Sequence, residues 1–171
     1  MEQSEAFENY PCRIILFSNL VTLAIYAIGA YIIFQVGLVW FVIYLAYITG
    51  LEIRLLKTRC VNCYYYGKLC AFGKGKLSSF LFKKGDPHKF LKDNLSWKDI
   101  LPDILVSIIP LIVGIALLIM KFNWLILSLI IVLVLLTSVG NGFVRGSLAC
   151  KFCKQREIGC HSEQLFDKSK K

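Results

Sequence analysis

Residues 14–51 form an apolar run that is too long for one membrane-spanning helix and too apolar for a soluble domain. Asn19 and Gln35 are almost the only strongly polar residues in it. At 1.5 Å per residue, a single helix of this length would be roughly twice as long as a bilayer core is thick. The chain must therefore turn back, and we expect the turn at residues 35–37, Gln-Val-Gly.

The second half of the chain has the same organisation, with a turn expected at residues 121–123. Four apolar blocks result, each close to the ~20 residues that a helix needs to cross a bilayer. The blocks are residues 14–36, 38–56, 100–120 and 124–143. They predict an all-α integral membrane protein with four transmembrane helices in two tight hairpins.

The basic residues predict the orientation of these hairpins. Lys121 is the only Lys or Arg near the two turns, so the other 19 of the 20 basic residues lie on the opposite side. The positive-inside rule then places both termini and the central loop in the cytoplasm of a multi-pass cell-membrane protein. The first dozen residues lack a basic n-region, so we expect the first helix to stay in the mature protein.

This topology divides the chain into six segments. They are a cytoplasmic N-terminus (1–13), hairpin 1 (14–56), a first cysteine arm (57–76), a basic amphipathic interfacial segment (77–99), hairpin 2 (100–146), and a second cysteine arm with a basic tail (147–171).

The same cysteine pattern, C-x2-C-x6-C, follows each hairpin. A shift of 90 residues maps the triplet Cys60, Cys63 and Cys70 onto the triplet Cys150, Cys153 and Cys160, whereas the outer turns are offset by about 86. We interpret the chain as one unit written twice, a hairpin followed by a cysteine arm. Because each unit returns the chain to the same side, the copies should be related by a pseudo-twofold axis along the membrane normal.

Cytoplasmic thiols are normally kept reduced, so six clustered cysteines indicate metal ligands or redox-active thiols rather than a structural disulfide framework. A C-x2-C turn brings two thiolates to one ion, and a third can return six residues later. Three thiolates do not complete a tetrahedral zinc site. Each arm must find a fourth ligand elsewhere, or the two arms must share ligands.

The doubled spacing at residues 60–70 and 150–160 resembles the Zn₂Cys₆ binuclear cluster of fungal DNA-binding regulators. In that cluster six thiolates complete two zinc sites because two of them bridge the ions. The resemblance implies bridging roles for Cys60 and Cys150, and terminal roles for the other four cysteines. It covers only these two segments, and a membrane hairpin separates them here, so we transfer the coordination chemistry and none of the nucleic-acid binding. Basic residues lie nearby in sequence and would offset the negative charge of the cluster: Arg59, Lys68, Lys151, Lys154 and Arg156.

Other interpretations of the cysteines stay open. An iron–sulfur cluster would use four thiolates and leave two spare. A dithiol relay between the C-x2-C pairs, or reduced thiols without a role, are further alternatives. Cys12 has no counterpart in the second half, and we expect it to be a small buried hydrophobic residue at a helix start. His88 and His161 are expected to be surface residues.

Two further groups of residues are candidates for function. Ionisable and amide side chains near the inner ends of the helices form a possible polar cluster, because such groups are costly in a membrane and often functional. They are Glu52, Asp103, Asn141 and Arg145, with Arg54 close by. The basic central loop is expected to lie on the inner leaflet and to contact anionic lipid headgroups.

Three functions are compatible with these features. The first is a non-catalytic, metal-clamped membrane protein that serves as a scaffold, a homo-oligomer or a subunit of a larger complex. The second is an iron–sulfur or dithiol redox protein. The third is a small membrane enzyme or transporter that uses the polar cluster on an anionic lipid or ion. We favour the first, because the sequence has no recognisable catalytic motif.

Overall fold

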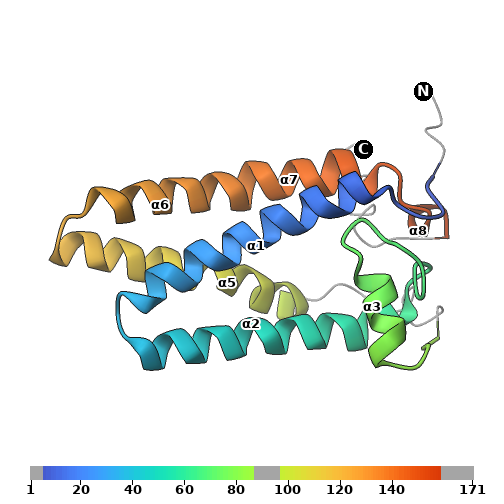
Figure 1. The fold of residues 1–171 in the computed structure, drawn as a ribbon, viewed down its shortest axis with the longest axis horizontal. Helices are drawn as coiled ribbons and strands as arrows, with labels where there is room; N and C mark the ends of the chain where they lie inside the picture. Colours follow the sequence, from blue (N-terminus) through green and yellow to red (C-terminus); the bar gives the residue numbers. More distant parts are fainter. Residues whose placement is uncertain (1–5, 87–96, 159–171) are drawn as a thin grey trace. The chain divides into compact units, whose positions relative to one another are not determined.

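The computed structural model describes residues 6–86 and 97–158, and this part of the chain is helical, with no β-strand. Four helices in it are long and apolar enough to cross a membrane, which confirms the predicted count. The first hairpin consists of α1 (Cys12–Phe34) and α2 (Leu38–Thr58), and the second begins with α5 (Trp97–Met120) and α6 (Trp124–Leu135). Each hairpin is followed by one of the cysteine segments (Figure 1).

The turns between the helices lie at residues 35–37 and 121–123, where the apolar run had to be broken. Gly37 has a φ of 151°, a conformation that glycine adopts at no steric cost. In the second turn the side chain of Asn123 accepts a hydrogen bond from the Leu125 backbone N–H at 2.9 Å and so caps α6. α5 begins at Trp97, so residues 97–99 belong to this helix and not to the interfacial segment.

The last helix continues from α6 to Cys150 but changes its type three times. A π-helix (η2, Leu136–Gly140), a short α-helix (α7, Asn141–Phe143) and a second π-helix (η3, Val144–Cys150) follow one another. Trp124 and Cys150 are 26 positions apart, whereas Leu38 and Cys60 are 22 apart. Hydrogen bonds in a π-helix reach five residues along the chain instead of four, so each turn holds more residues. The outer turns of the two hairpins are offset by about 86 residues and the cysteines by 90, which leaves four additional residues in the last helix. The π segments take up part of these four residues.

The chain folds into two compact units. One, the arm unit, comprises Met1–Ser18, Ile53–Ser96 and Val144–Lys171; the other, the span unit, comprises Asn19–Glu52 and Trp97–Phe143. The short helices η1 (Cys60–Asn62), α3 (Lys74–Leu81) and α8 (Gln155–Ile158) belong to the arm unit.

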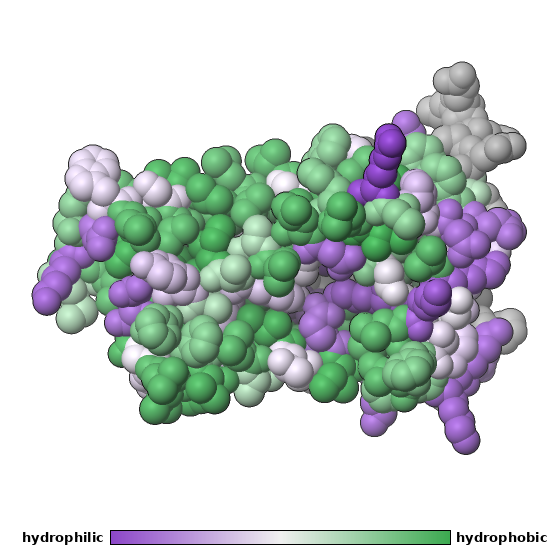
Figure 2. Space-filling view, in the orientation of Figure 1, coloured by the Kyte–Doolittle hydropathy of each residue, from purple (hydrophilic) through white to green (hydrophobic). Residues whose placement is uncertain are grey.

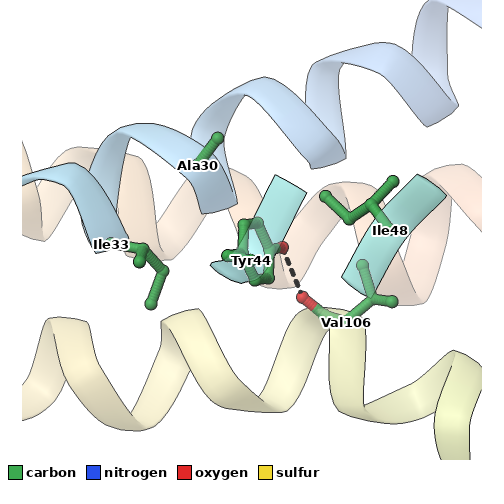
Figure 3. Packing of buried hydrophobic residues seen from close by; sticks show 5 residues of the cluster. All are labelled: Ala30, Ile33, Tyr44, Ile48 and Val106. Atoms are coloured by element: carbon green, nitrogen blue, oxygen red, sulfur yellow. Dashed lines mark hydrogen bonds between the residues drawn. The ribbon is translucent and has the colours of Figure 1, made fainter. Parts of the chain in front are cut away.

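The core of the span unit is a small cluster contributed by three helices (Figure 3). Its buried members are Ala30 and Ile33 of α1, Tyr44 and Ile48 of α2, and Val106 of α5. Glycine allows close packing elsewhere in this unit, because a Cβ on Gly114 of α5 would lie 2.8 Å from the Ile130 side chain of α6. Many large apolar side chains of the long helices are exposed, and Figure 2 shows hydrophobic surface along them. A lipid environment would cover this surface, as expected for a multi-pass membrane protein.

Candidate metal centre in the cysteine arms

Five of the six predicted cysteine ligands lie in the described part of the chain, and Cys160 lies outside it. Cys60 opens η1 directly after α2, and Cys150 ends η3. These two residues and Cys63, Cys70 and Cys153 are half-buried. Cys12 is instead exposed at the first residue of α1, so the expectation that it is a buried hydrophobic residue is wrong.

The two C-x2-C turns have the same backbone hydrogen bonds. The N–H of Cys63 donates to the Cys60 carbonyl at 3.3 Å, and the N–H of Cys153 donates to the Cys150 carbonyl at 3.3 Å. Each turn is then closed by a second bond of 3.0 Å, from Tyr66 to the Cys63 carbonyl and from Arg156 to the Cys153 carbonyl. The two segments therefore share a local backbone conformation, although the intervening residues differ.

Cysteines from both arms pack against one hydrophobic cluster in the arm unit. Its buried members are Tyr10, Tyr65, Ala71 and Ala149. Cys63, Cys70 and Cys153 are among the half-buried residues that surround it. Residues about 90 positions apart in the sequence thus lie around the same two tyrosine rings, whose centroids are 5.6 Å apart.

The thiols also influence these tyrosines electrostatically. Burial raises the pKa of Tyr65 to about 12, and the negative charge that Cys153 and Cys63 acquire as thiolates acts in the same direction. Burial likewise raises the pKa of Tyr10, and Cys153 and Cys150 add to the effect. Both hydroxyl groups are therefore neutral at physiological pH and keep their protons for hydrogen bonding.

A reciprocal pair of hydrogen bonds joins the two arms. The Tyr64 N–H donates to Oε1 of Gln155 at 2.8 Å, and the Lys154 N–H donates to the Tyr65 hydroxyl at 3.0 Å. The 90-residue shift relates Tyr64 to Lys154 and Tyr65 to Gln155. In each bond the backbone N–H of one arm therefore donates to the side chain of the residue that, in the other arm, follows its own equivalent. The two acceptor side chains are also buried to the same degree, with exposed fractions of 2% for Tyr65 and 4% for Gln155.

The N-terminal segment, residues 7–10, is bonded to both arms. The Phe7 N–H donates to the Phe152 carbonyl at 3.0 Å, and the Tyr65 hydroxyl donates to the Phe7 carbonyl at 2.6 Å. Tyr10 donates its N–H to the Leu69 carbonyl at 2.9 Å. Sequence reasoning assigned residues 1–13 only a cytoplasmic location. Two aromatic residues just ahead of the first apolar block, at positions 7 and 10, were the available signal for this packing.

The basic residues of the arms have specific partners. Lys154 Nζ forms a 2.8 Å ion pair with Glu8, which lowers the pKa of that carboxyl and raises the pKa of the Lys154 ammonium. Lys68 donates to the Tyr64 hydroxyl at 3.0 Å, and Lys151 lies over the Phe152 ring. One thiol has a backbone donor, because the Gly75 N–H points to Cys70 Sγ at 3.4 Å.

No group of three or more Cys, His, Asp or Glu side chains within residues 6–86 and 97–158 is arranged to hold a metal ion. The donor set suits zinc chemically, since thiolates in C-x2-C turns are its usual structural ligands. The sixth thiol of the predicted set, Cys160, lies outside these residues.

The predicted polar cluster is only partly assembled by contacts within one unit. In the span unit the Tyr26 hydroxyl donates to Glu52 Oε1 at 2.7 Å, and Asp103 also acts electrostatically on Tyr26. Asn141 lies in α7 of the same unit, whereas Arg145 lies in η3 of the arm unit. A functional role for these four residues stays a prediction.

The span unit also contains an apolar cavity of about 500 Å³ between α1, α2 and α5. It is lined by Ile33, Val36, Trp40, Ile43, Tyr44, Tyr47, Ile109 and Val113. None of the predicted polar-cluster residues contributes to this lining. The cavity therefore gives no support to a site for ions or anionic substrates. Comparisons with protein-family models, curated proteins and solved structures give no match for this chain.

Proposed function

We propose that this multi-pass membrane protein is a non-catalytic scaffold or complex subunit whose two cysteine arms are clamped together by a shared zinc centre. The ligands are Cys60, Cys63, Cys70, Cys150, Cys153 and Cys160, and the arms lie on the cytoplasmic side, where 19 of the 20 basic residues fall. The observation that carries the proposal is the packing of cysteines from both arms around the Tyr10–Tyr65 pair.

The reciprocal bonds between Tyr64 and Gln155 and between Lys154 and Tyr65 support a shared centre over two separate ones. A twofold relation between two arms produces such exchangeable contacts, and a binuclear cluster with six thiolates has the same symmetry. The matching turns at Cys60–Cys63 and Cys150–Cys153 support a common ligand geometry in the two arms.

Metal binding would complete the folding of this region. Zinc requires deprotonated thiols, and its binding energy is coupled to the ordering of the segments that carry them. In small peptides this contribution is on the order of 10 kcal/mol at neutral pH. Such a clamp matters for a membrane protein, because lipid provides no hydrophobic driving force between the hairpins.

Elemental analysis of the full chain, purified without oxygen in detergent, tests the proposal. We expect about two zinc ions per chain, and no visible absorption of an iron–sulfur centre. Cys63→Ser and Cys153→Ser should each lower the zinc content of both arms, because the ions share ligands. Cys12→Ser is the matched control, since this exposed thiol lies outside the two triplets, and it should retain the full zinc content.

Three results would contradict the shared zinc centre. Loss of one ion in each variant with retention of the other would show two independent sites. Stoichiometric iron with visible absorption would favour the redox alternative. Protein without any bound metal, in which all six thiols react freely with an alkylating reagent, would exclude a metal centre.

A further inference from the structure

The helix α3 presents an apolar stripe that the described residues of the arm unit leave exposed. Leu77, Phe80 and Leu81 have exposed fractions of 50%, 87% and 53%. Their spacing of three and four residues places them on one face of the helix. An exposed phenylalanine between two exposed leucines is unusual on a water-facing surface and indicates a partner for this face.

The opposite face of α3 is anchored in the arm unit. Ser78 is fully buried and donates its hydroxyl to the Leu56 carbonyl at 3.3 Å. Gly75 packs so closely on the Tyr65 carbonyl that a Cβ there would clash with this backbone oxygen. These contacts fix the direction of the helix about its own axis, so the apolar stripe must face away from the arm unit.

The contact with Leu56 also fixes the level of α3 along the membrane-crossing helix. Leu56 lies two residues before the end of α2 and belongs to the candidate span Leu38–Asn62. A helix beside this position lies at the depth where the span leaves the hydrocarbon region. Figure 1 shows α3 next to this end of α2.

Lysines border the apolar stripe on both sides. At 3.6 residues per turn, Lys74 follows one edge of the stripe and Lys76 the other. Lys83 and Lys84 follow directly after the helix, and residues 74–84 include no acidic side chain. Figure 2 shows hydrophobic surface over α3 next to hydrophilic residues. An apolar stripe flanked by basic residues is the pattern of helices that lie in the plane of an anionic membrane surface.

We propose that α3 is an interfacial anchor that inserts Leu77, Phe80 and Leu81 into an anionic lipid leaflet. Lys74, Lys76, Lys83 and Lys84 then contact the headgroup phosphates, with their alkyl chains along the apolar boundary. The level set by Leu56 and the uniform positive charge select a bilayer over a protein partner or a second copy of the chain. This inference depends on the membrane-spanning helices and is independent of the metal centre.

Fluorescence from a tryptophan at position 80 tests the proposal in the full-length protein. Phe80→Trp is reconstituted in bilayers with and without anionic lipid, and its emission is compared with that of the parent, which has three tryptophans. Asp86→Trp, at an exposed position after the helix, is the matched control. We expect the additional emission at position 80 to be quenched by lipids with brominated acyl chains. The emission at position 86 should instead be quenched by acrylamide from the water phase.

The dependence of insertion on lysine charge provides a second test. Each lysine near an anionic surface favours the bound state by about fivefold, so Lys74→Gln with Lys76→Gln should weaken insertion in anionic bilayers. Both side chains are at the surface or half-buried, so the fold should be retained. Equal acrylamide quenching at positions 80 and 86 would overturn the proposal. Protection at position 80 from both quenchers would also overturn it, and would indicate a protein or a second copy on this face.

Discussion

Removal of the Tyr44 hydroxyl should destabilise the span unit, because this group replaces a hydrogen bond that Pro110 cannot make. Proline has no N–H, so the Val106 carbonyl, four residues earlier in α5, loses its normal helical donor. The Tyr44 hydroxyl donates to this carbonyl at 2.7 Å (Figure 3). Tyr44 has an exposed fraction of 4%, so water cannot easily take its place.

The expected magnitude follows from the burial of both partners. Tyr44→Phe keeps the ring and leaves the Val106 carbonyl without its donor. A buried polar group left without a partner costs about 1–3 kcal/mol. Pro110→Ala restores an N–H at the correct position in α5, and in this background the Tyr44 hydroxyl is no longer needed. In the Pro110→Ala background we therefore expect Tyr44→Phe to lower the free energy of unfolding by only a few tenths of a kcal/mol. The parent, the two single variants and the double variant form a double-mutant cycle, and the difference between the two costs of Tyr44→Phe is its coupling energy.

Reversible unfolding in mixed detergent micelles, measured for the four proteins of this cycle, provides the assay. Tyr47→Phe is a useful comparison, since its hydroxyl donates at 2.8 Å to the Pro102 carbonyl, which the Val106 N–H can also reach within the helix. Its loss should cost less than that of Tyr44 and should not couple to Pro110→Ala. Equal costs for Tyr44→Phe with and without Pro110 would refute the reasoning.

Three other predictions concern the arm unit. Tyr65→Phe and Gln155→Met should each lower the free energy of unfolding by about 1–3 kcal/mol, because each removes the buried acceptor of a backbone N–H in the other arm. Tyr65→Phe should cost at least as much as Gln155→Met, because it also removes the donor to the Phe7 carbonyl. A Gln155→Met variant as stable as the parent in chemical denaturation would argue against the reciprocal arrangement. Gly67→Ala should cost about 1–2 kcal/mol, since φ is 78° there. Gly142→Ala, at a helical position with open space, should be neutral or stabilising in the same melting experiment. The ion pair with Lys154 lowers the pKa of Glu8 in the folded protein. This ion pair therefore stabilises the protein fully above pH about 4.5, the usual pKa of a glutamate carboxyl, and the stabilisation is lost as the pH falls through the lowered pKa of the folded state. The stability difference between Glu8→Gln and the parent should therefore be present near neutral pH and disappear in acid; a difference that grows in acid would contradict this assignment.

The four helices could be predicted from sequence because a single constraint dominates them. Residues 14–51 are apolar, a bilayer has a limited thickness, and only Gln35 to Gly37 offers a turn. Hydrophobicity alone does not report helix type, however. The π-helical segments after Leu135 depend on how the last helix absorbs its additional residues, and neither π segment has a compositional signal.

The contacts within the arm unit were less predictable, since they depend on individual polar atoms. The spacing of the cysteines located both turns, but it contained no information on residues 7–10, which bond to both arms through their backbone. Gln155 had no special sequence context, and its role became evident only from its burial and its bond to the Tyr64 N–H. Sequence reasoning began the basic amphipathic segment at residue 77, whereas the helix α3 already begins at Lys74, after Gly73 with a φ of 69°.

Tyrosine has one physical role in both units, which explains why these positions carry tyrosine and not phenylalanine. Among the described residues, five tyrosine hydroxyls donate to backbone carbonyls. The pairs are Tyr10 with Ala149, Tyr44 with Val106, Tyr47 with Pro102, Tyr65 with Phe7, and Tyr66 with Phe82. Pro110 in α5 and irregular backbone in the arms leave carbonyl groups that no helical N–H reaches, whereas the Pro102 carbonyl keeps the Val106 N–H as a second donor. Burial in a hydrophobic cluster keeps water away from such carbonyls. A tyrosine ring packs like any apolar group and carries a single donor at its tip, so it can bring this donor across a hydrophobic cluster without burying any other polar atom. Phenylalanine at these positions would remove the side-chain donor of each carbonyl, and of the five only the Pro102 carbonyl would keep a helical one.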